Sequence, residues 1–318
     1  MATLAQSQKT PKASAKSGNL QRTQQIWGWL FLSPWIIGFL AFSLIPIVVS
    51  LYFSFTDFNL VSGQAPQFND IAHWKRMFTN DPILKIALTA TLKFALIALP
   101  LSLALPGLLA ALLNSEYLKI KPIFRTLFYM PYMVPVVSSV YIWGGMLSTD
   151  SGWINRFLAN FGIAGPDWLY SVSWIYPALN IIGLWGVGNA MLITLASMQG
   201  VPTELYEAAK VDGANPFRRF FHITIPMISP VIFYNLIISV IGLFRYFEIP
   251  YILKKGLGDP ANSTMFLNIH LYKEAFEFQD MGYGSALAWL LFILAMGATA
   301  IIFFSARHWV YYASGDGR

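Results

Sequence analysis

The chain has 318 residues, of which 56% are hydrophobic and only 11% are charged. Soluble globular proteins carry about 25% charged residues, so this composition excludes a soluble globular protein, and its apolar content excludes a disordered one. The 21 Lys and Arg against 15 Asp and Glu give a net charge of +6, which in a membrane protein bears on orientation and not on nucleic-acid binding. No cysteine is present, which excludes disulfides, thiolate metal sites and cysteine nucleophiles.

Six long windows of the sequence lack Asp, Glu, Lys and Arg. A membrane-spanning helix needs about 20 apolar residues, so each window can hold one. Prolines inside several windows predict kinked helices whose freed carbonyls are satisfied by neighbouring helices. The expected fold class is therefore all-α, a polytopic membrane protein with six transmembrane helices. The predicted spans are 27–55, 86–113, 124–147, 173–198, 225–252 and 283–306.

The predicted organisation is a membrane domain between two short tails. Residues 1–25 are expected to form a basic, disordered cytoplasmic tail, residues 26–310 the membrane domain, and residues 311–318 a second cytoplasmic tail. The first apolar run is far longer than the roughly 7–15 residues of a signal-peptide core, which favours an uncleaved span. Six spans put both termini on one side, and that side carries twelve Lys and Arg against seven on the other. The positive-inside rule then predicts that both termini are cytoplasmic.

The segment 201–226, between the fourth and fifth predicted spans, is expected to form two short helices around a turn. Thr203 is the expected N-cap of the first helix. Gly213 can end that helix in a left-handed conformation. Asn215 is the expected N-cap of the second helix, with Pro216 at its first position.

The first of these short helices has a small apolar face with no evident cover in its own chain. An amphipathic helix lying on lipid and a docking element for a partner explain this face equally well. Arg218 and Arg219 follow near the membrane surface, where anionic headgroups or a partner can contact them. The residues of the apolar face are Leu205, Tyr206, Ala208, Ala209 and Val211.

The same loop resembles a known signature. Glu207-Ala208-Ala209, then Gly213 after three residues, then Ile223-Thr224-Ile225-Pro226 after nine more is similar to the EAA signature of membrane subunits of binding-protein-dependent ABC importers. Ile225 stands where the signature usually has leucine. Four other segments are also similar to this family, in particular to the first permease subunit of its carbohydrate-uptake subgroup, the maltose and glycerol-3-phosphate type. These segments are 51–57, 124–131, 195–202 and 283–289.

The resemblance implies the type I ABC importer permease fold and a transport function. It implies a permease subunit, in the cytoplasmic (inner) membrane, of an ATP-driven importer that takes up a sugar or sugar derivative delivered by an extracytoplasmic binding protein. The further partners it implies are a second homologous permease subunit, an ABC ATPase dimer and the lipid bilayer; no nucleic acid is expected. A secondary transporter of a small polar solute is the alternative, disfavoured because the sequence has no clear internal repeat and no buried acidic relay.

The resemblance also assigns the EAA loop, whose first helix would dock into a cleft on the ATPase subunit. No G-x-x-x-x-G-K-[ST] motif is present, so ATP and Mg are expected on the partner ATPase and no cofactor on this chain. No catalytic residue and no metal site are expected, because no hydrolase motif occurs and the four histidines are scattered. The chain is therefore predicted not to be an enzyme. The expected coupling residues are Glu207, Ala208, Ala209, Asp212, Gly213, Ile223 and Pro226.

A polar stripe in the fifth predicted span marks a candidate substrate path. Its residues recur at helical spacing and share one face, which suits either a polar lumen or close helix packing. The lumen is favoured, and the resemblance adds Trp185 and Asn189 of the fourth span to the same space. The stripe consists of Asn235, Ser239, Gly242 and Tyr246.

Two further features lie after this stripe. Arg245 and Glu248 are three residues apart and are expected either to form a structural ion pair or to act as a gate or substrate contact, the pair being favoured. The amphipathic run 265–278 is expected to lie at the outer surface, where a binding protein could dock.

Overall fold

The computed structural model describes residues 17–312, and their side chains from Arg22 onward. Residues 1–16 of the predicted tail 1–25 and residues 313–318 of the predicted tail 311–318 lie outside the described residues. Residues 17–25, expected to be disordered, belong to a helix. The chain divides into two units, Met1–Tyr52 and Phe53–Arg318. All the helices and helical turns of the described residues follow one another without an intervening strand, which agrees with the predicted all-α class.

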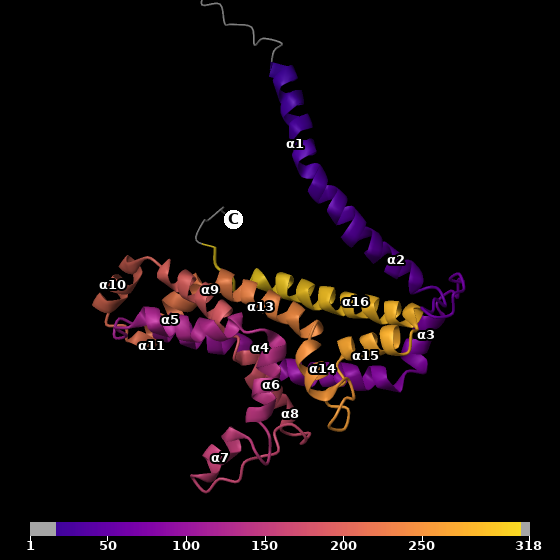
Figure 1. Ribbon diagram of the computed structural model, residues 1–318. Coiled ribbons are helices and arrows are strands. Elements are labelled where there is room, and N and C mark those ends of the chain that lie inside the picture. Colours follow the sequence, from indigo (N-terminus) through magenta and orange to yellow (C-terminus); the bar gives the residue numbers. More distant parts are fainter. Residues whose placement is uncertain (1–16, 313–318) are drawn as a thin grey trace, which may run out of the picture. The chain divides into compact units, whose positions relative to one another are not determined.

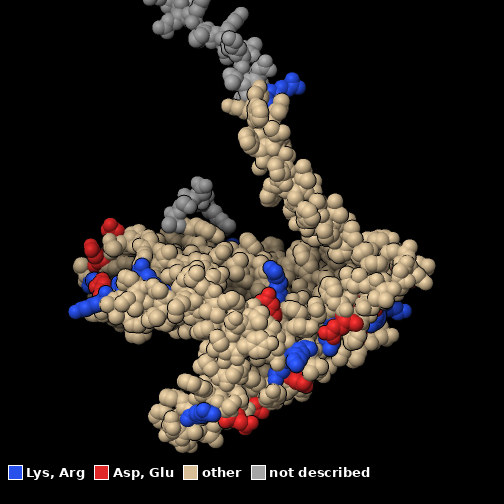
Figure 2. Space-filling view, in the orientation of Figure 1, with Lys and Arg blue, Asp and Glu red and all other residues tan. Residues whose placement is uncertain are grey.

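The first unit is one long apolar helix. It consists of α1 (Ser17–Phe39), a π-helical turn (Leu40–Leu44) and α2 (Ile45–Phe53), so it begins ten residues before the predicted first span (Figure 1). The π turn ends two residues before Pro46, whose missing N–H cannot complete the ordinary ladder of hydrogen bonds. Its surface is uncharged apart from the basic end at Arg22 (Figure 2). None of its most apolar window is buried within the chain, so lipid or another subunit must cover it.

The second unit is a bundle built around α4 (Pro82–Asn114), which packs against α8, α9, α13 and α15. At a rise of about 1.5 Å per residue, its 33 residues extend about 50 Å, well beyond the hydrocarbon core of a bilayer. The unit includes two short helices, α3 (Ala72–Thr79), which precedes α4, and α7 (Trp153–Ala159), which follows α6. Its other helices are α5 (Lys121–Tyr129), α6 (Val136–Met146), α8 (Ile175–Leu184), α9 (Gly188–Gln199), α10 (Thr203–Val211), α11 (Pro216–Arg219), α12 (Ile225–Met227), α13 (Ser229–Phe244), α14 (Glu248–Lys254), α15 (Leu267–Tyr272) and α16 (Met281–Ala306).

Three of the predicted spans are broken. The third bends by 101° between Met133 and Val136, next to prolines that cannot continue the hydrogen-bond ladder, and the fourth bends by 58° between α8 and α9. The fifth is interrupted for three residues between α13 and α14, but Ser229–Lys254 is still long and apolar enough to cross a membrane as one helix. Four helices can each cross a membrane alone, and the number is six when each bent pair counts as one span, so the exact number of six remains a prediction.

A glycine fixes the position of the break in the fourth span. A Cβ on Gly188, the first residue of α9, would come within 2.4 Å of the carbonyl oxygen of Phe128. Only glycine lets α9 approach the backbone of α5 this closely. The close approach holds α5 against α9 near the α10–α11 end of the unit (Figure 1).

The run 265–278 corrects one expectation. Met265, Phe266 and Ile269 are buried, since α15 packs against α4 and α16. The amphipathic pattern therefore belongs to a helix whose apolar side completes the core, and not to a helix lying on the surface. Only the end of the run, with Phe276 and Phe278, is exposed.

Candidate functional site

The EAA loop folds as two short helices joined by a tight turn. α10 ends with the backbone pattern of a Schellman motif, in which Ala214 N–H donates to the Ala209 carbonyl (2.8 Å) and Gly213 N–H donates to the Lys210 carbonyl (3.0 Å). Gly213 has φ +76°, the left-handed conformation that the sequence predicts. A Cβ placed on it would meet nothing within 4 Å. Glycine is therefore needed there for its backbone conformation and not for space.

The caps of the two helices differ in one respect from the prediction. Asn215 caps α11 as expected, its Oδ1 accepting from Arg218 N–H at 2.8 Å, and Pro216 is the first helical residue. Thr203, the predicted cap of α10, is instead its first residue, and Pro202 occupies the cap position without a side-chain hydrogen bond. The proline fixes the extended conformation that a capping residue needs, so no hydroxyl cap forms.

Most of α10 is bare. Glu207 and Ala208 are exposed and Ala209 is half-buried, while Leu205 is 41% and Val211 88% exposed. Asp212, at the end of the helix, is also exposed. The exposed apolar side chains have no cover within the described residues, as the sequence predicts.

One side chain of α10 does find a partner in its own chain. The Tyr206 hydroxyl lies 2.8 Å from Oγ1 of Thr224, which is buried just before the helix that opens the fifth span. Around it pack Phe220, Ile223 and Ile225, at the edge of an apolar cluster formed with α4 and α9. The hydrogen bond ties the exposed helix to the start of the fifth span. The two residues lie 18 positions apart in the sequence, so no short sequence motif predicts this hydrogen bond.

Ile223 and Pro226 belong to this connection. Ile223 is half-buried in the same cluster. The carbonyl of Pro226 accepts a hydrogen bond from Ser229 Oγ at 2.6 Å, and that oxygen accepts from Tyr311 N–H at 2.8 Å. The end of the EAA loop is thus fastened both to α13 and to the segment after α16.

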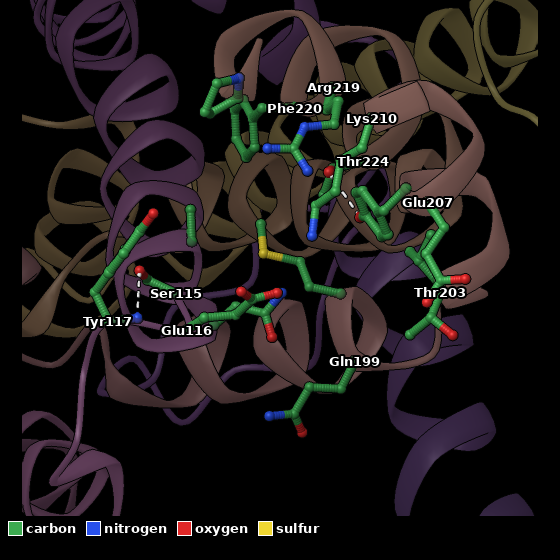
Figure 3. A pocket seen from close by; sticks show the side chains of 16 residues that line it. Ser115, Glu116, Tyr117, Gln199, Thr203, Glu207, Lys210, Arg219, Phe220 and Thr224 are labelled. Atoms are coloured by element: carbon green, nitrogen blue, oxygen red, sulfur yellow. Dashed lines mark hydrogen bonds between the residues drawn. The ribbon is translucent and has the colours of Figure 1, made fainter. Parts of the chain in front are cut away.

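A cavity of about 550 Å³ lies behind α10, between this helix, α11 and the segment that follows α4. Figure 3 shows Lys210 and Arg219 directed into the cavity from one wall and Glu116 from the opposite wall. Glu207 and Thr203 line a third side. Charged side chains of both signs gather over this end of the unit (Figure 2).

The polar stripe of the fifth span divides into two environments. Asn235 is buried and donates to Thr194 Oγ1 of α9 at 3.1 Å, which is a helix-packing contact. Ser239, Gly242 and Tyr246 line a cavity of about 160 Å³ between α13 and α4. The Ser239 hydroxyl accepts a hydrogen bond from Ser102 of α4 at 3.1 Å.

A second cavity of about 340 Å³ begins at the break between α13 and α14. Gly242 and Tyr246 line both cavities, and the Tyr246 ring stacks on Phe94 at a centroid distance of 4.5 Å. The Tyr246 hydroxyl is buried and has no hydrogen-bond partner among the described residues.

Trp185 and Asn189 do not join these cavities in the described structure. Trp185 lies at the break between α8 and α9 and meets Trp143 edge to face at 5.9 Å, and Asn189 is exposed. The fourth span bends by 58° between α8 and α9, close to these two residues.

Arg245 and Glu248 also depart from the expected arrangement. The helix ends at Phe244 and resumes at Glu248, so the two side chains are not three residues apart on one helix. Both are exposed and both line the second cavity, but the ion pairs of the described residues do not include them. The expected structural pair is absent for this geometric reason.

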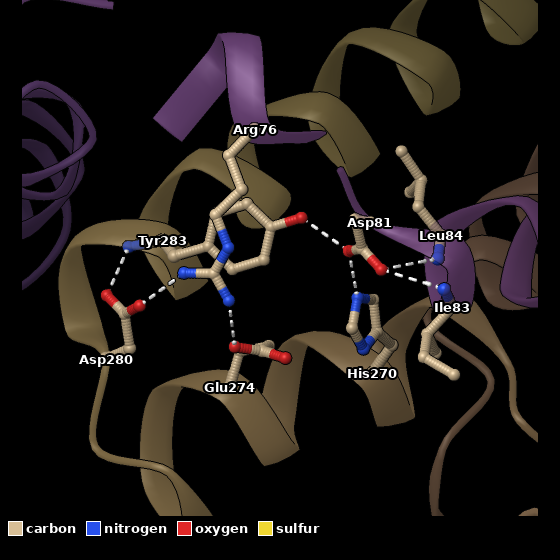
Figure 4. Close-up of polar contacts among 8 residues, drawn as sticks. All are labelled: Arg76, Asp81, Ile83, Leu84, His270, Glu274, Asp280 and Tyr283. Carbon is tan, nitrogen blue, oxygen red and sulfur yellow. Dashed lines mark hydrogen bonds and ion pairs between the residues drawn. The ribbon is translucent and has the colours of Figure 1, made fainter. Parts of the chain in front are cut away.

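A polar cluster at the α3–α15 end of the unit was missed from the sequence. Oδ1 of Asp81 accepts from the N–H groups of Ile83 (2.8 Å) and Leu84 (3.0 Å) and so caps α4. Oδ2 accepts from the Tyr283 hydroxyl and contacts Nε2 of His270 at 2.6 Å (Figure 4). One carboxylate thereby holds the ends of α4, α15 and α16 together.

Arg76 completes the cluster from α3. Its guanidinium pairs with Asp280 at 2.7 Å and Glu274 at 3.3 Å and lies 3.9 Å from the centroid of the Tyr283 ring. Burial raises the pKa of Glu274 above its ordinary value, although His270 and Arg76 oppose the shift. Asp81 followed by Pro82 is a sequence pattern typical of a helix N-cap. No sequence pattern predicts the contacts of Asp81 with His270 and Tyr283, which lie about 200 positions away.

The pKa of Asp81 is lowered despite its burial. Burial acts to raise it, but the hydrogen bonds from Tyr283 and His270 stabilise the carboxylate more strongly. A carboxyl with a lowered pKa stabilises the fold above its unfolded pKa, and this contribution is lost as the pH falls through the folded pKa. Asp81 therefore strengthens this end of the bundle at neutral pH.

Comparison with known proteins identifies the family. A family model described as "Binding-protein-dependent transport system inner membrane component" matches residues 103–311, which include the EAA loop and the whole of the fifth span. The chain belongs to this family. It is a multi-pass membrane protein and a transport subunit, not an enzyme, as predicted.

Curated relatives match almost the whole chain. A "Probable ABC transporter permease protein YesP" of Bacillus subtilis (strain 168) is 37% identical over 93% of this chain and 95% of the relative. The "Lactose transport system permease protein LacF" of Rhizobium radiobacter is 31% identical over 93% of this chain and 99% of the relative.

Solved structures share the fold. A bacterial alginate ABC transporter in complex with an alginate pentasaccharide-bound periplasmic protein contains a chain with a TM-score of 0.78 and 22% identity, covering 91% of this chain and 96% of that chain. The predicted ABC importer permease fold is thereby confirmed.

Proposed function

We propose that the chain is the permease subunit of an ATP-driven importer that takes up a sugar or sugar derivative delivered by an extracytoplasmic binding protein. Relatives with lactose and arabinooligosaccharide in their names support a carbohydrate substrate. The dependence of the family on a binding protein supports that partner. The exposed, glycine-ended α10 carries the proposal, because its bare apolar face and its bond to the fifth span suit an element that a partner moves.

The partner proposed for α10 is an ABC ATPase dimer, which binds ATP and Mg in place of this chain. Glu207, Ala208 and Ala209 would meet a cleft on that partner, and Gly213 would hold the turn that presents them. Asp212 ends the same exposed helix. Ile223 and Pro226, which join the loop to the fifth span, would transmit the movement. A second homologous permease subunit would cover apolar surface such as that of α1.

The proposed path for the substrate runs along the two cavities of the fifth span. Ser239 offers a hydroxyl group to sugar hydroxyls, and the Tyr246 ring, which stacks on the buried Phe94, offers apolar surface to sugar C–H groups. Arg245 and Glu248 line the wider cavity and are proposed as contacts at its mouth. Asn235 would support the path by packing. Trp185 and Asn189 enter the proposal on the family resemblance alone.

The proposed orientation places both termini and the EAA loop in the cytoplasm. Twelve Lys and Arg on that side against seven on the other support it. The bundle end with α3 and α15 would then face the binding protein, and the protein would reside in the cytoplasmic membrane of the cell.

Reconstitution tests the proposal. The chain is purified with its partner permease, ATPase and binding protein, placed in vesicles, and assayed for uptake of labelled sugars with and without internal ATP. We expect uptake that requires both ATP and the binding protein and that Glu207→Lys abolishes. Uptake driven by an ion gradient without ATP would establish the secondary-transporter alternative instead.

A further inference from the structure

The cavity behind α10 is lined by Glu207 of the proposed coupling helix and also by three charged side chains that have no part in the proposed coupling. Arg219 and Lys210 enter from one wall and Glu116 from the other (Figure 3). In the part of the chain that the structure describes, none of these three side chains belongs to an ion pair. The Nε atom of Arg219 is buried without a hydrogen-bond partner. A guanidinium and an ammonium group on one wall suit an anionic ligand such as a phosphate.

The position of the cavity indicates where such a ligand comes from. Two apolar spans end at Asn114 of α4 and Gln199 of α9, and both residues line the cavity together with the segments that follow them. The hydrocarbon core is about 30 Å thick and the whole bilayer about 40–45 Å, so a helix of about 50 Å passes through the headgroup layers. The end of α4, and the cavity beside it, can therefore be reached by lipid headgroups.

The surroundings suit a lipid as well. Ala111, Met198 and Phe220 line the apolar part of the cavity. Tyr117, also at its rim, is 95% exposed, and tyrosine is typical of the membrane interface. The neighbouring Leu112 is 57% exposed on α4, so an acyl chain can continue along the helix from the cavity.

We propose that this cavity binds the headgroup of a zwitterionic phospholipid with a primary ammonium group, such as phosphatidylethanolamine. The phosphate would lie against Arg219 and Lys210, and the ammonium group would donate to the carboxylate of Glu116. A phosphatidylglycerol headgroup lacks the cation that Glu116 requires. Phosphatidylcholine has a cation but no N–H to donate. The site concerns lipid recognition and does not depend on which substrate is transported.

Lipid retention by the intact transport complex tests the proposal. The complex is equilibrated in detergent with equal amounts of phosphatidylethanolamine, phosphatidylglycerol and phosphatidylcholine, and retained lipids are counted by native mass spectrometry. Arg219→Gln is compared with Arg218→Gln, because Arg218 is the exposed neighbour outside the cavity. Glu116→Gln is compared with Glu204→Gln, since Glu204 is exposed on α10 and does not line the cavity.

We expect the wild-type complex to retain phosphatidylethanolamine preferentially and Arg219→Gln to reduce this retention about tenfold, the effect of losing one charged hydrogen bond. Glu116→Gln should remove the preference over the other two lipids. The two control variants should match wild type. Lys210→Gln provides a second variant of the cation wall if Arg219→Gln fails to assemble.

Two results would overturn the proposal. One is equal retention of the three lipids by the wild-type complex. The other is unchanged lipid retention in Arg219→Gln accompanied by release of ATPase subunits, which would assign the cavity to a protein side chain. Loss of lipid binding with normal ATP-driven uptake would refute neither proposal, because lipid retention and coupling are measured separately.

Discussion

Replacement of Gly213 is the sharpest test of the EAA loop as a coupling element. At φ +76° a residue with a Cβ costs about 1–2 kcal/mol, and a β-branched residue costs more. Because a Cβ there would touch nothing within 4 Å, this cost is entirely one of backbone conformation. We therefore expect Gly213→Val to distort the turn between α10 and α11 and Gly213→Ala to do so less.

The matched control is Gly162→Val. Gly162 has φ +72° and the same open surroundings, but it lies in the loop after α7. Both valine variants should lower the thermal stability of the complex by similar amounts. Only Gly213→Val should reduce the ATPase activity stimulated by the binding protein, together with uptake and co-purification of the ATPase. Stimulated ATPase activity at the wild-type level in Gly213→Val would refute the assignment of this loop.

Four further variants test the remaining arguments. Tyr206→Phe removes the bond to the fifth span and should weaken coupling by about 1 kcal/mol, visible as a lower ratio of stimulated to basal ATPase; an unchanged ratio would show that the bond transmits nothing. Asp81→Ala removes a helix cap and two side-chain hydrogen bonds and should destabilise the complex by about 2–5 kcal/mol in thermal unfolding, whereas a loss below about 1 kcal/mol would contradict the clamp. Gly242→Leu should block uptake without loss of assembly, because a Cβ at Gly242 meets nothing within 4 Å and the larger side chain would fill the space between the two cavities; unimpaired uptake would exclude this route. Single cysteines at Ser62 and Tyr117, both exposed, should be labelled by an impermeant thiol reagent in intact cells at the first position only, and the reverse pattern would invert the proposed orientation.

The sequence predicts those parts of this protein that depend on neighbours along the chain. Charge-free windows locate the apolar helices because the bilayer demands length and low charge of each helix separately. The left-handed Gly213 and the Asn215 cap follow from local backbone chemistry. The family signature added the role of the loop, which no periodicity contains.

The parts that the sequence did not predict depend on contacts between distant segments. The run 265–278 has the pattern of a surface helix, but its apolar side is covered by α4 and α16. The stripe in the fifth span was also hard to interpret from the sequence. Asn235 and Ser239 are both polar and lie on one face of the helix, but Asn235 contacts α9 and Ser239 contacts α4. Periodicity identifies a face but not the helix opposite it.

The two ends of the second unit differ in a way that bears on transport. At the α3–α15 end, Asp81 alone accepts four hydrogen bonds and joins three helices, so this end resists deformation. At the α10–α11 end, the exposed helix is connected to the bundle through Tyr206 and an apolar cluster, beside a cavity of about 550 Å³. We therefore expect a force applied to α10 to deform its own end before it disturbs the other. The break in the fifth span borders the cavity of about 340 Å³, so a change in its bend would alter this cavity while the Asp81 cluster stays intact.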